Sequence, residues 1–338
     1  MILIFTNKED THPTNVIKYL TEWGVEVFRF NTECLMTDYR FGWWCNDEGY
    51  DFYIRNIRNG REMYGHQVTA VWDRRPSVPS SLPVQHENEE INKHILDEAH
   101  SFLSFLRYWM RNIYSIGNIV EDRPADSKML QLSVARSLGM HIPDTCFSNM
   151  RDKIIAMTAP YEFLSLKPIG SSSVLVGDTD EEYVFYSQKV RTADLQQMPE
   201  SAFSQSVNFV QNYVEKAYEL RITVCCNDVV ACKIDSQAMD DDKGKIDWRQ
   251  GYDYDLKHEI VELPEKIKTF CLQFLEKMKL KFGCFDFIVT PEGDYVFLEC
   301  NPNGQWLWIE ILTGYDISKI VARNLAKYEK TYSKKDDN

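Results

Sequence analysis

The sequence predicts a mixed α/β protein, and segments near its two ends carry this prediction. The chain opens with an apolar stretch at 2–7, a helix-like stretch from Pro13 to about Trp23, and a β-rich stretch at 25–31, the order of a parallel βαβ unit. Near the other end, residues 283–308 (GCFDFIVTPEGDYVFLECNPNGQWLW) contain two β-rich runs separated by a Pro-Glu-Gly-Asp turn. We therefore expect a parallel α/β domain combined with an antiparallel hairpin.

Composition favours a globular protein that works without a membrane or a nucleic acid. At 338 residues with 44% hydrophobic side chains, the chain can bury a large core in two or three subdomains. Its net charge of −13 argues against a surface that coats nucleic acid, and no apolar run approaches the length of a membrane span. The N-terminus, MILIFTNKED, does not resemble a signal peptide. Nine scattered cysteines without zinc spacing favour a reduced, cytoplasmic chain.

Residues 1–115 are expected to form an N-terminal α/β domain. After the βαβ start, the aromatic segment RFGWWCNDEGYDFYIRN predicts a hairpin, and a strand follows at 68–73. A long helix is predicted over about 86–113, because apolar residues recur there at helical spacing. Arg74 and Arg75 follow the strand directly, and such strand ends face ligand crevices. They are candidates to bind an acidic substrate, with a structural role as the alternative.

Two further units are expected at 116–206 and 207–330, before a frayed tail at 331–338. The central unit is predicted to contain a helix and three strands, at 127–138, 163–168, 173–178 and 183–190. The C-terminal unit is predicted to contain the strands LRITVCC and VVACKID, a charged mobile loop at 239–247, a helix at about 264–280 and the terminal hairpin.

Three oxygen-bearing side chains can converge in the terminal hairpin. Glu299 and Asn301 are two residues apart, so they share one face of a strand, and Asp286 on the partner strand can face them. Acidic residues on a strand are most often solvated, but these lie among Phe, Ile, Val and Leu, where an unpaired carboxylate is costly. Two carboxylates and an amide oxygen suit Mg²⁺, which takes its remaining ligands from water and phosphate. We therefore predict a magnesium site at these three residues.

Two lysines stand where an anion would explain them. Lys128 begins a predicted helix, where the helix dipole disfavours a positive charge, although a solvated surface lysine is the alternative. Lys167 ends an apolar strand. The small residues after it have N–H groups and hydroxyls that can cover phosphates: Gly170, Ser171, Ser172 and Ser173. The chain carries no GxxxxGK[ST] loop and no recognisable Ser/His/Asp or Cys/His nucleophile set, so the chemistry should need no protein nucleophile.

In this order along the chain, these segments resemble the ATP-grasp ligases. In that family a D…E-x-N set on adjacent strands holds the Mg²⁺ ions that bridge the ATP phosphates, and two lysines contact the nucleotide. The resemblance implies that FVQNYVEKAYELRITV is the nucleotide hinge. The backbone that would contact adenine is Gln211, Asn212, Tyr213 and Val214. Glu219 would hold the ribose hydroxyls, and Arg221 would point at the γ-phosphate or an acyl phosphate. The implied cofactors are ATP and Mg²⁺, clamped between two α+β subdomains of an ATP-grasp fold.

The string FDFIVTPEGDYVFLECNPNGQWLWIE, together with Asp247-Trp248-Arg249, is similar to one branch of that family, the graspetide synthetases. These are microviridin-type peptide maturases that form ω-esters or ω-amides. Arg249, with Asp247 beside it, and Lys233 on a nearby strand are candidates to hold a substrate carboxylate or the transferring phosphate, with surface ion pairs as the alternative. Asn303 could line the substrate side or cap the next helix.

The resemblance implies ATP-dependent macrocyclisation of a ribosomally made precursor peptide with a leader and an acidic core, by an enzyme that is often a homodimer. Asp or Glu carboxylates would be activated as acyl phosphates and attacked by Ser or Thr hydroxyls or by Lys amines. Two other functions stay open: a ligase that adds an amino acid to a peptide or protein, and a non-catalytic nucleotide- or peptide-binding module. The intact lysine, carboxylate and amide set argues against the module.

Overall fold

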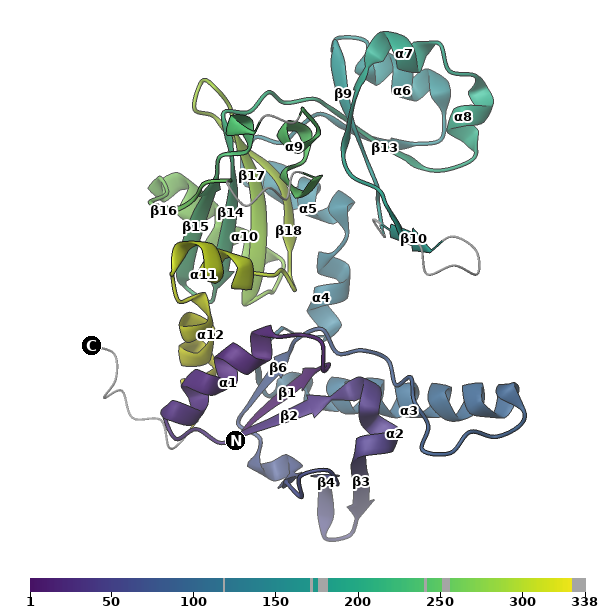
Figure 1. Ribbon diagram of the computed structural model, residues 1–338, viewed down its shortest axis with the longest axis vertical. Helices are drawn as coiled ribbons and strands as arrows, with labels where there is room; N and C mark the ends of the chain where they lie inside the picture. Colours follow the sequence, from purple (N-terminus) through teal and green to yellow (C-terminus); the bar gives the residue numbers. More distant parts are fainter. Residues whose placement is uncertain (118, 171–172, 176–181, 240–241, 251–255, 330–338) are drawn as a thin grey trace.

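A computed structural model describes residues 1–117, 119–170, 173–175, 182–239, 242–250 and 256–329, and it confirms the mixed α/β class (Figure 1). One four-stranded sheet near the N-terminus is parallel, and the larger sheets that follow, of four and five strands, are antiparallel. Ser171, Ser172 and the tail 331–338 lie outside the described residues. No described helix is long and apolar enough to span a membrane.

The parallel sheet has the order β2–β1–β6–β7. Its strands are β1 (Ile2–Thr6), β2 (Val27–Asn31), β6 (Ala70–Asp73) and β7 (Tyr114–Ile116). Both faces are covered, because Ile2 and Ile4 pack with α1 (His12–Glu22) whereas Leu3 and Phe5 pack with α3 (Glu89–Trp109). Coverage on both faces explains why β1 is apolar along most of its length instead of alternating.

An antiparallel hairpin covers part of the α3 side of this domain, as predicted. It is formed by β3 (Tyr39–Asn46) and β4 (Gly49–Asn56), and β5 (Glu62–Tyr64) adds a third strand. Tyr39, Phe52 and Ile54 are buried in the core that includes α3, whereas Trp43 and Tyr50 near the tip are exposed. In β4 the buried Phe52 and Ile54 alternate with more exposed neighbours, which is the period-2 pattern of a sheet with one solvated face.

The central sheet has the order β12–β9–β13–β8 and carries its own small core. Its strands are β8 (Thr145–Ser148), β9 (Phe163–Lys167), β12 (Gln188–Arg191) and β13 (Asn208–Asn212). The helices of this unit are α6 (Arg151–Thr158), α7 (Thr192–Gln196) and α8 (Glu200–Ser204), and a small hairpin is formed by β10 (Ser173–Leu175) and β11 (Glu182–Val184). Because β13 pairs with β8 and β9, the change to the next sheet comes after Asn212, later than the boundary expected at 207.

The C-terminal sheet has the order β16–β15–β14–β17–β18. Its strands are β14 (Tyr218–Cys225), β15 (Asp228–Ile234), β16 (His258–Val261), β17 (Phe282–Val289) and β18 (Tyr295–Asn301). One face packs against α10 (Glu265–Lys277) and α5 (Lys128–Ser137). This position of α5 differs from the predicted one in the central unit, since Leu132 and Ala135 belong to the C-terminal core. Ser127 caps α5 by accepting the Leu130 N–H at 3.4 Å, and Gly139 beyond its end has φ +75°.

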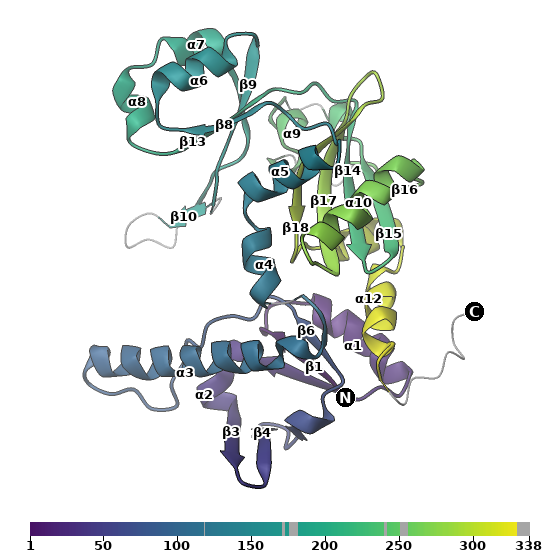
Figure 2. The ribbon, with the colours of Figure 1, turned by 180° about the vertical axis from the view of Figure 1, so that it is seen from behind.

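A single core joins the first domain to the C-terminal sheet. Trp306, fully buried, packs in the same cluster as Ile4, Leu20 and Phe282. The chain after Trp306 forms α11 (Leu307–Thr313) and α12 (Ile317–Ala326), and α12 returns to lie against α1 (Figures 1 and 2). The central sheet, by contrast, lies apart from the parallel sheet and beside one end of the C-terminal sheet (Figure 2).

The charged segment at 239–247 differs from the expected mobile loop. Its described part forms a short helix, α9 (Asp242–Ile246), which follows β15. Another short helix, α4 (Ile119–Ala125), comes much earlier, between β7 and α5. The Lys216 side chain donates to the Ile246 carbonyl at 2.9 Å, and Gln237 donates to the Lys245 carbonyl at 3.1 Å. These two bonds from distant residues tie the segment down, and composition alone could not reveal them.

Phe274 sits in a cluster of aromatic rings between α10 and the C-terminal sheet, with its centroid 5.3 Å from those of Phe285 and Phe297. We expect Phe274→Ala to lower the free energy of unfolding by about 3–5 kcal/mol, because the ring is fully buried and its removal leaves a cavity. Phe105→Ala is the control: that ring is 72% exposed, and the change should stay within about 0.5 kcal/mol. Urea unfolding measures both, and equal midpoints would contradict the importance of this cluster.

Candidate active site

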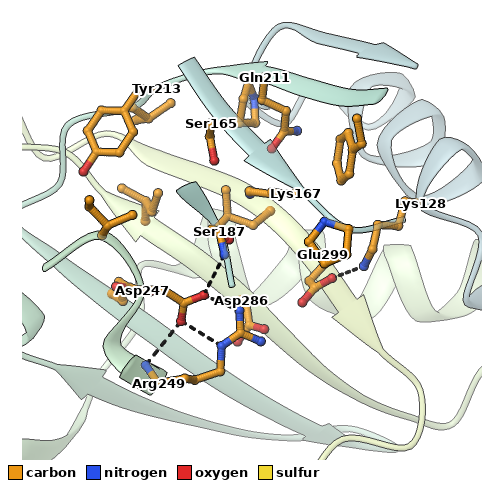
Figure 3. Close-up of a pocket in the computed structure, with 18 of the residues that line it drawn as sticks. Lys128, Ser165, Lys167, Ser187, Gln211, Tyr213, Asp247, Arg249, Asp286 and Glu299 are labelled. Carbon is orange, nitrogen blue, oxygen red and sulfur yellow. Dashed lines mark hydrogen bonds and ion pairs between the residues drawn. The ribbon is translucent and has the colours of Figure 1, made fainter. Parts of the chain in front are cut away.

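A cavity of about 310 Å³ lies where the central sheet meets the C-terminal sheet (Figure 3). It is bounded by β9 and β13 on one side, by β17 and β18 on the other, and by the segment after α9. Many residues singled out in the sequence line it: Lys128, Lys167, Gly170, Gln211, Asn212, Tyr213, Val214, Glu219, Asp247, Arg249, Asp286, Glu299 and Asn301. The fold thus brings residues from across 174 positions of sequence, from Lys128 to Asn301, to one cavity.

The two carboxylates of the hairpin lie directly opposite each other. Asp286 on β17 pairs in register with Glu299 on β18, and Asn301 pairs with Cys284 two positions away. A bulge follows, since Phe287 pairs with Phe297, so Leu298 is the extra residue and also lines the cavity. The Asn301 side-chain oxygen accepts the Asn303 N–H at 2.9 Å, which orients the amide.

Each carboxylate has its own cation from another element. The Lys128 ammonium at the start of α5 donates to Glu299, and the Arg221 guanidinium on β14 donates to both Asp286 oxygens at 2.8 and 2.9 Å (Figure 3 shows the Glu299 pair). Burial opposes ionisation of Glu299, but Lys128 and the nearby charge of Lys167 outweigh it and lower its pKa to about 2. For Asp286, burial and the neighbouring Glu299 charge raise the pKa despite Arg221. Glu299 is therefore ionised at neutral pH.

Lys167, at the end of β9, lines the cavity within the electrostatic influence of Glu299 and Asp247. Burial, together with the positive charges of Lys128 and Arg249, lowers the pKa of Lys167 to about 8, although Glu299 acts in the opposite direction. Lys167 shares the cavity with Lys128, which makes this end of it locally cationic in a protein of net charge −13. An anion with several charged oxygens would relieve the repulsion between the two ammonium groups.

The hinge between the two sheets has a mixed supply of hydrogen-bonding groups. The Asn212 and Tyr213 N–H groups donate to the carbonyls of Asp144 (3.1 Å) and Phe163 (3.0 Å), so both are used within the protein. Gln211 is 1% exposed, its amide nitrogen donates to the Thr145 hydroxyl at 2.9 Å, and its side-chain oxygen has no partner among the described residues. A buried orphan acceptor next to the cavity is a costly feature that a bound donor would offset.

Lys216 belongs to the site although sequence reasoning missed it. Its ammonium donates to Glu219 at 2.5 Å and to the Ile246 carbonyl, so it joins the hinge, β14 and α9. Burial raises the pKa of Glu219 in spite of this partner. The only available signal was the spacing, because a lysine three residues before a candidate ribose ligand stands within reach of it. Ser165 and Ser187 also line the cavity and carried no such signal.

Asp247 and Arg249 form a local fork at the cavity rim. The Arg249 Nε and a terminal nitrogen donate to the two Asp247 oxygens at 2.8 and 2.7 Å, and Asp247 is 4% exposed. This hydrogen bonding raises the pKa of Arg249, so its guanidinium is charged. Between them, Trp248 in the 3₁₀ turn Trp248–Gln250 packs against Trp308 at 5.1 Å. Asp247 therefore lines the cavity and also fixes the orientation of Arg249.

Lys233 does not lie in this site, which corrects its assignment as a candidate to bind the carboxylate or phosphate. It pairs in register with Leu220, whose side chain is buried in the α10 core, so both side chains project from the face opposite Arg221 and Asp286. Its ammonium lies 4.6 Å above the Tyr218 ring on that face. The choice of face depends on the strand register, which the sequence of β15 alone does not reveal.

Arg74 is also corrected, from a substrate contact to a buried structural group. It is 1% exposed and bound by Asp10 and by two backbone carbonyls, so it is closed to an acidic peptide. Arg75 is exposed with φ +48°, and neither arginine lines the cavity. Asn303 lies beside Arg74 and outside the cavity lining. Arg221 likewise sits behind Asp286 instead of lining the cavity toward a phosphate.

The residues present fit Mg²⁺ and a nucleotide. Among the described residues no group of three or more His, Cys, Asp or Glu could hold a metal, so a site made by protein carboxylates alone is absent there. Two carboxylates and one oriented amide oxygen are instead the donor set of an ion that completes its shell with phosphate and water. The cationic end near Lys167 and the orphan acceptor of Gln211 offer partners for the two ends of such a nucleotide.

Comparison with known proteins agrees with this geometry. Residues 1–122 match the family described as the MvdD pre-ATP grasp domain, and no curated protein sequence matches the chain. Among solved structures, a RiPP-associated ATP-grasp ligase of Chryseobacterium gregarium, in complex with ADP and a leader and core peptide, is 27% identical with TM-score 0.86, and the match covers 96% of each chain. RiPPs are ribosomally made, modified peptides.

Two macrocyclases of Microcystis aeruginosa are also similar. MdnC, solved with its precursor peptide MdnA, is 28% identical with TM-score 0.81, over 96% of this chain and 99% of that one. MdnB shares the fold at 22% identity and TM-score 0.75, with the same coverage. Together with the cavity geometry, these likenesses show that the chain has the ATP-grasp fold, with an MvdD-type pre-ATP grasp domain over residues 1–122, and that over nearly its whole length it is similar to RiPP-associated ATP-grasp ligases and macrocyclases.

Proposed function

We propose that this protein is an ATP-dependent ligase that closes ester or amide rings in a ribosomally made precursor peptide. The observation that carries the proposal is the convergence of Asp286, Glu299, Asn301, Lys128 and Lys167 on one cavity with Arg249 at its rim. The relatives solved with a leader and core peptide and ADP, or with a precursor peptide, support the same class of substrate.

The residues divide into three roles. Asp286, Glu299 and Asn301 would hold Mg²⁺, which when bound neutralises charge on the phosphate oxygens. Lys128 would release Glu299 in part, and Lys128 and Lys167 would both bind the phosphates. The hinge would contact adenine through its carbonyls and the Val214 N–H, since the Asn212 and Tyr213 N–H groups are already used. Glu219, oriented by Lys216, would hold the ribose hydroxyls.

The reaction itself needs positioning and charge more than covalent help from the protein. Arg249 would hold the side-chain carboxylate of a substrate Asp or Glu while one of its oxygens takes the terminal phosphoryl group of ATP, releasing ADP. A substrate hydroxyl or amine then attacks the acyl carbon, loses its proton and displaces phosphate. The sum is ATP plus linear peptide giving ADP, phosphate and a ring, and the tether makes the second step effectively unimolecular.

The finer parts of the proposal are the metal, the assembly and the compartment. We propose Mg²⁺ for the oxygen set, a homodimer, and the cytoplasm as the place of action. All nine cysteines are free thiols, which suits a reducing compartment. Sedimentation velocity tests the assembly: a monomer at micromolar concentration would contradict the dimer.

The function is tested with an acidic peptide rich in Thr, Ser or Lys that is encoded beside the gene. We expect peptide-dependent release of phosphate from ATP and a product lighter by one water for each ring. A product heavier by one amino acid would instead indicate a peptide-extending ligase. If none of the candidate acidic peptides induces phosphate release from ATP, the result would favour a non-catalytic module.

We expect Glu299→Gln to lower turnover by at least about 100-fold, because it removes a charged oxygen that would hold the Mg²⁺ whose charge stabilises the phosphates. The fold should persist, since the two side chains have the same shape, and circular dichroism checks this. Glu292→Gln, at the exposed tip of the same hairpin, is the matched control and should leave turnover unchanged. Near-normal turnover in the Glu299 variant would overturn the metal assignment.

We expect Arg249→Ala to impair ring formation far more than nucleotide binding, because the guanidinium is placed at the rim to hold a carboxylate. Ring formation is followed by mass spectrometry and ADP affinity by calorimetry. Arg191→Ala is the control, since that arginine pairs with Asp194 on the exposed surface of the central unit. Equal losses of ring formation and ADP affinity would move Arg249 into the nucleotide site.

ADP affinity should fall as pH rises through about 8, the pKa of Lys167 in the free protein. Its charge is present below that pKa and lost above it, whereas bound phosphate would keep the lysine protonated. The affinity at pH 9 should therefore be about tenfold lower than at pH 7. Lys167→Arg keeps the charge and should flatten the profile. A wild-type profile that is already flat over this range would show that Lys167 does not bind the phosphates.

A further inference from the structure

The segment 302–306, here called the PNGQW loop, follows the metal-site strand β18 and is held by the N-terminal domain. Arg74, at the end of β6, donates from one terminal nitrogen to the carbonyls of Asn303 and Gly304, both at 2.9 Å. Its Nε donates to Asp10 at 2.9 Å, and its guanidinium lies 4.9 Å from the centre of the Trp306 ring. An arginine 1% exposed is expensive to bury, so its bonding to two carbonyls across a domain boundary indicates a specific task.

His12 holds the other end of the PNGQW loop. Its Nε2 accepts the N–H of Trp306 at 3.2 Å and lies 3.5 Å from the Leu307 nitrogen, and its Nδ1 lies 2.7 Å from Asp10. The ring also meets Trp306 edge-on, with centroids 4.6 Å apart. Because Nε2 accepts from the backbone, the neutral ring carries its proton on Nδ1 and donates to Asp10. Burial, together with the positive charge of Arg74, lowers the pKa of His12 and favours this neutral form.

On its opposite side the PNGQW loop contacts Cys284 and Arg221, which lie next to the cavity residue Asp286. Gly304 packs so closely that a Cβ there would lie 2.3 Å from the Cys284 Cβ and 3.0 Å from an Arg221 nitrogen. Arg221 donates to the Gln305 carbonyl at 3.4 Å and to both oxygens of Asp286. A continuous set of contacts therefore runs from Asp10 through Arg74 and the loop to Arg221 and Asp286.

We propose that Arg74 and His12 are positioning residues through which the N-terminal domain holds the PNGQW loop and, through Arg221, aligns Asp286 for Mg²⁺ and nucleotide. This inference rests on the proposed function for the role of Asp286. It assigns to the N-terminal domain a part in the phosphate site, although no residue of that domain lines the cavity. It also gives the PNGQW loop a role, since Arg74 and His12 both bind its backbone.

The test compares Arg74→Met with Arg107→Met in the full-length protein. Arg107 is a matched control, because it also forms a bidentate pair in this domain, partly buried, with Asp73 at 2.7 Å, but does not touch the loop. Hydrogen exchange at residues 301–308 is measured without nucleotide, and ADP affinity is measured with and without Mg²⁺. We expect about tenfold faster exchange and a loss of the Mg²⁺-dependent part of ADP affinity in Arg74→Met alone.

A second pair keeps the test valid if Arg74→Met does not fold. His12→Gln can keep an acceptor near the Nε2 position, whereas His12→Leu removes it, so Gln should restore slow exchange of the Trp306 amide and Leu should not. Unchanged exchange in both His12→Leu and Arg74→Met, or equal acceleration in Arg107→Met, would overturn the proposal. If the proposed function is wrong but this inference is right, Arg74→Met and His12→Leu still accelerate exchange in the loop, whereas no candidate peptide induces phosphate release from ATP.

Discussion

The site depends on one electrostatic constraint: two carboxylates, Asp286 and Glu299, lie side by side on neighbouring strands in a partly buried place. Like charges opposite each other in a sheet repel, and burial increases the cost. The structure offsets this with cations that no single element could supply, since Arg221 comes from β14 and Lys128 from the start of α5. Lys167 adds a third charge from the central sheet. The three elements must therefore meet at the hairpin.

This constraint explains features that look unrelated in the sequence. The α5 helix packs on the C-terminal sheet instead of the central one, which brings its first residue to Glu299. The bulge at Leu298 lets the strand continue into the apolar core while Glu299 stays opposite Asp286. Beyond the strand, the tight passage at Gly304 lets Arg221 reach the Gln305 carbonyl as well as Asp286. Positive and negative side chains are therefore already in place at the site before a nucleotide and Mg²⁺ bind.

Local sequence predicted much of this because the relevant geometry is local. Period-2 alternation placed Glu299 and Asn301 on one face, and the turn at 291–294 made β17 their partner strand. The bulge at Leu298, which no sequence pattern predicted, shifts the register by one residue and brings Asp286 opposite Glu299. Hinge residues such as Gln211 and the rim residue Arg249 were found only through the resemblance to the ATP-grasp ligases, and the structure places them at the cavity. Sequence reasoning failed at two lysines. Whether Lys233 faces the cavity depends on which face of its strand packs against α10, and whether Lys216 joins the site depends on the position of α9.

By itself the sequence determined the mixed α/β class, most elements and the oxygen set of the terminal hairpin, because hydrophobic period and turn residues act over a few positions. Only the tertiary structure decided the fate of Arg74. A charged residue after a strand can face a crevice or be buried, and the difference lies in partners as far away as Gly304, 230 positions along the chain. Such contacts follow from how the N-terminal domain and the C-terminal sheet share one core around Trp306, and no local pattern encodes that packing.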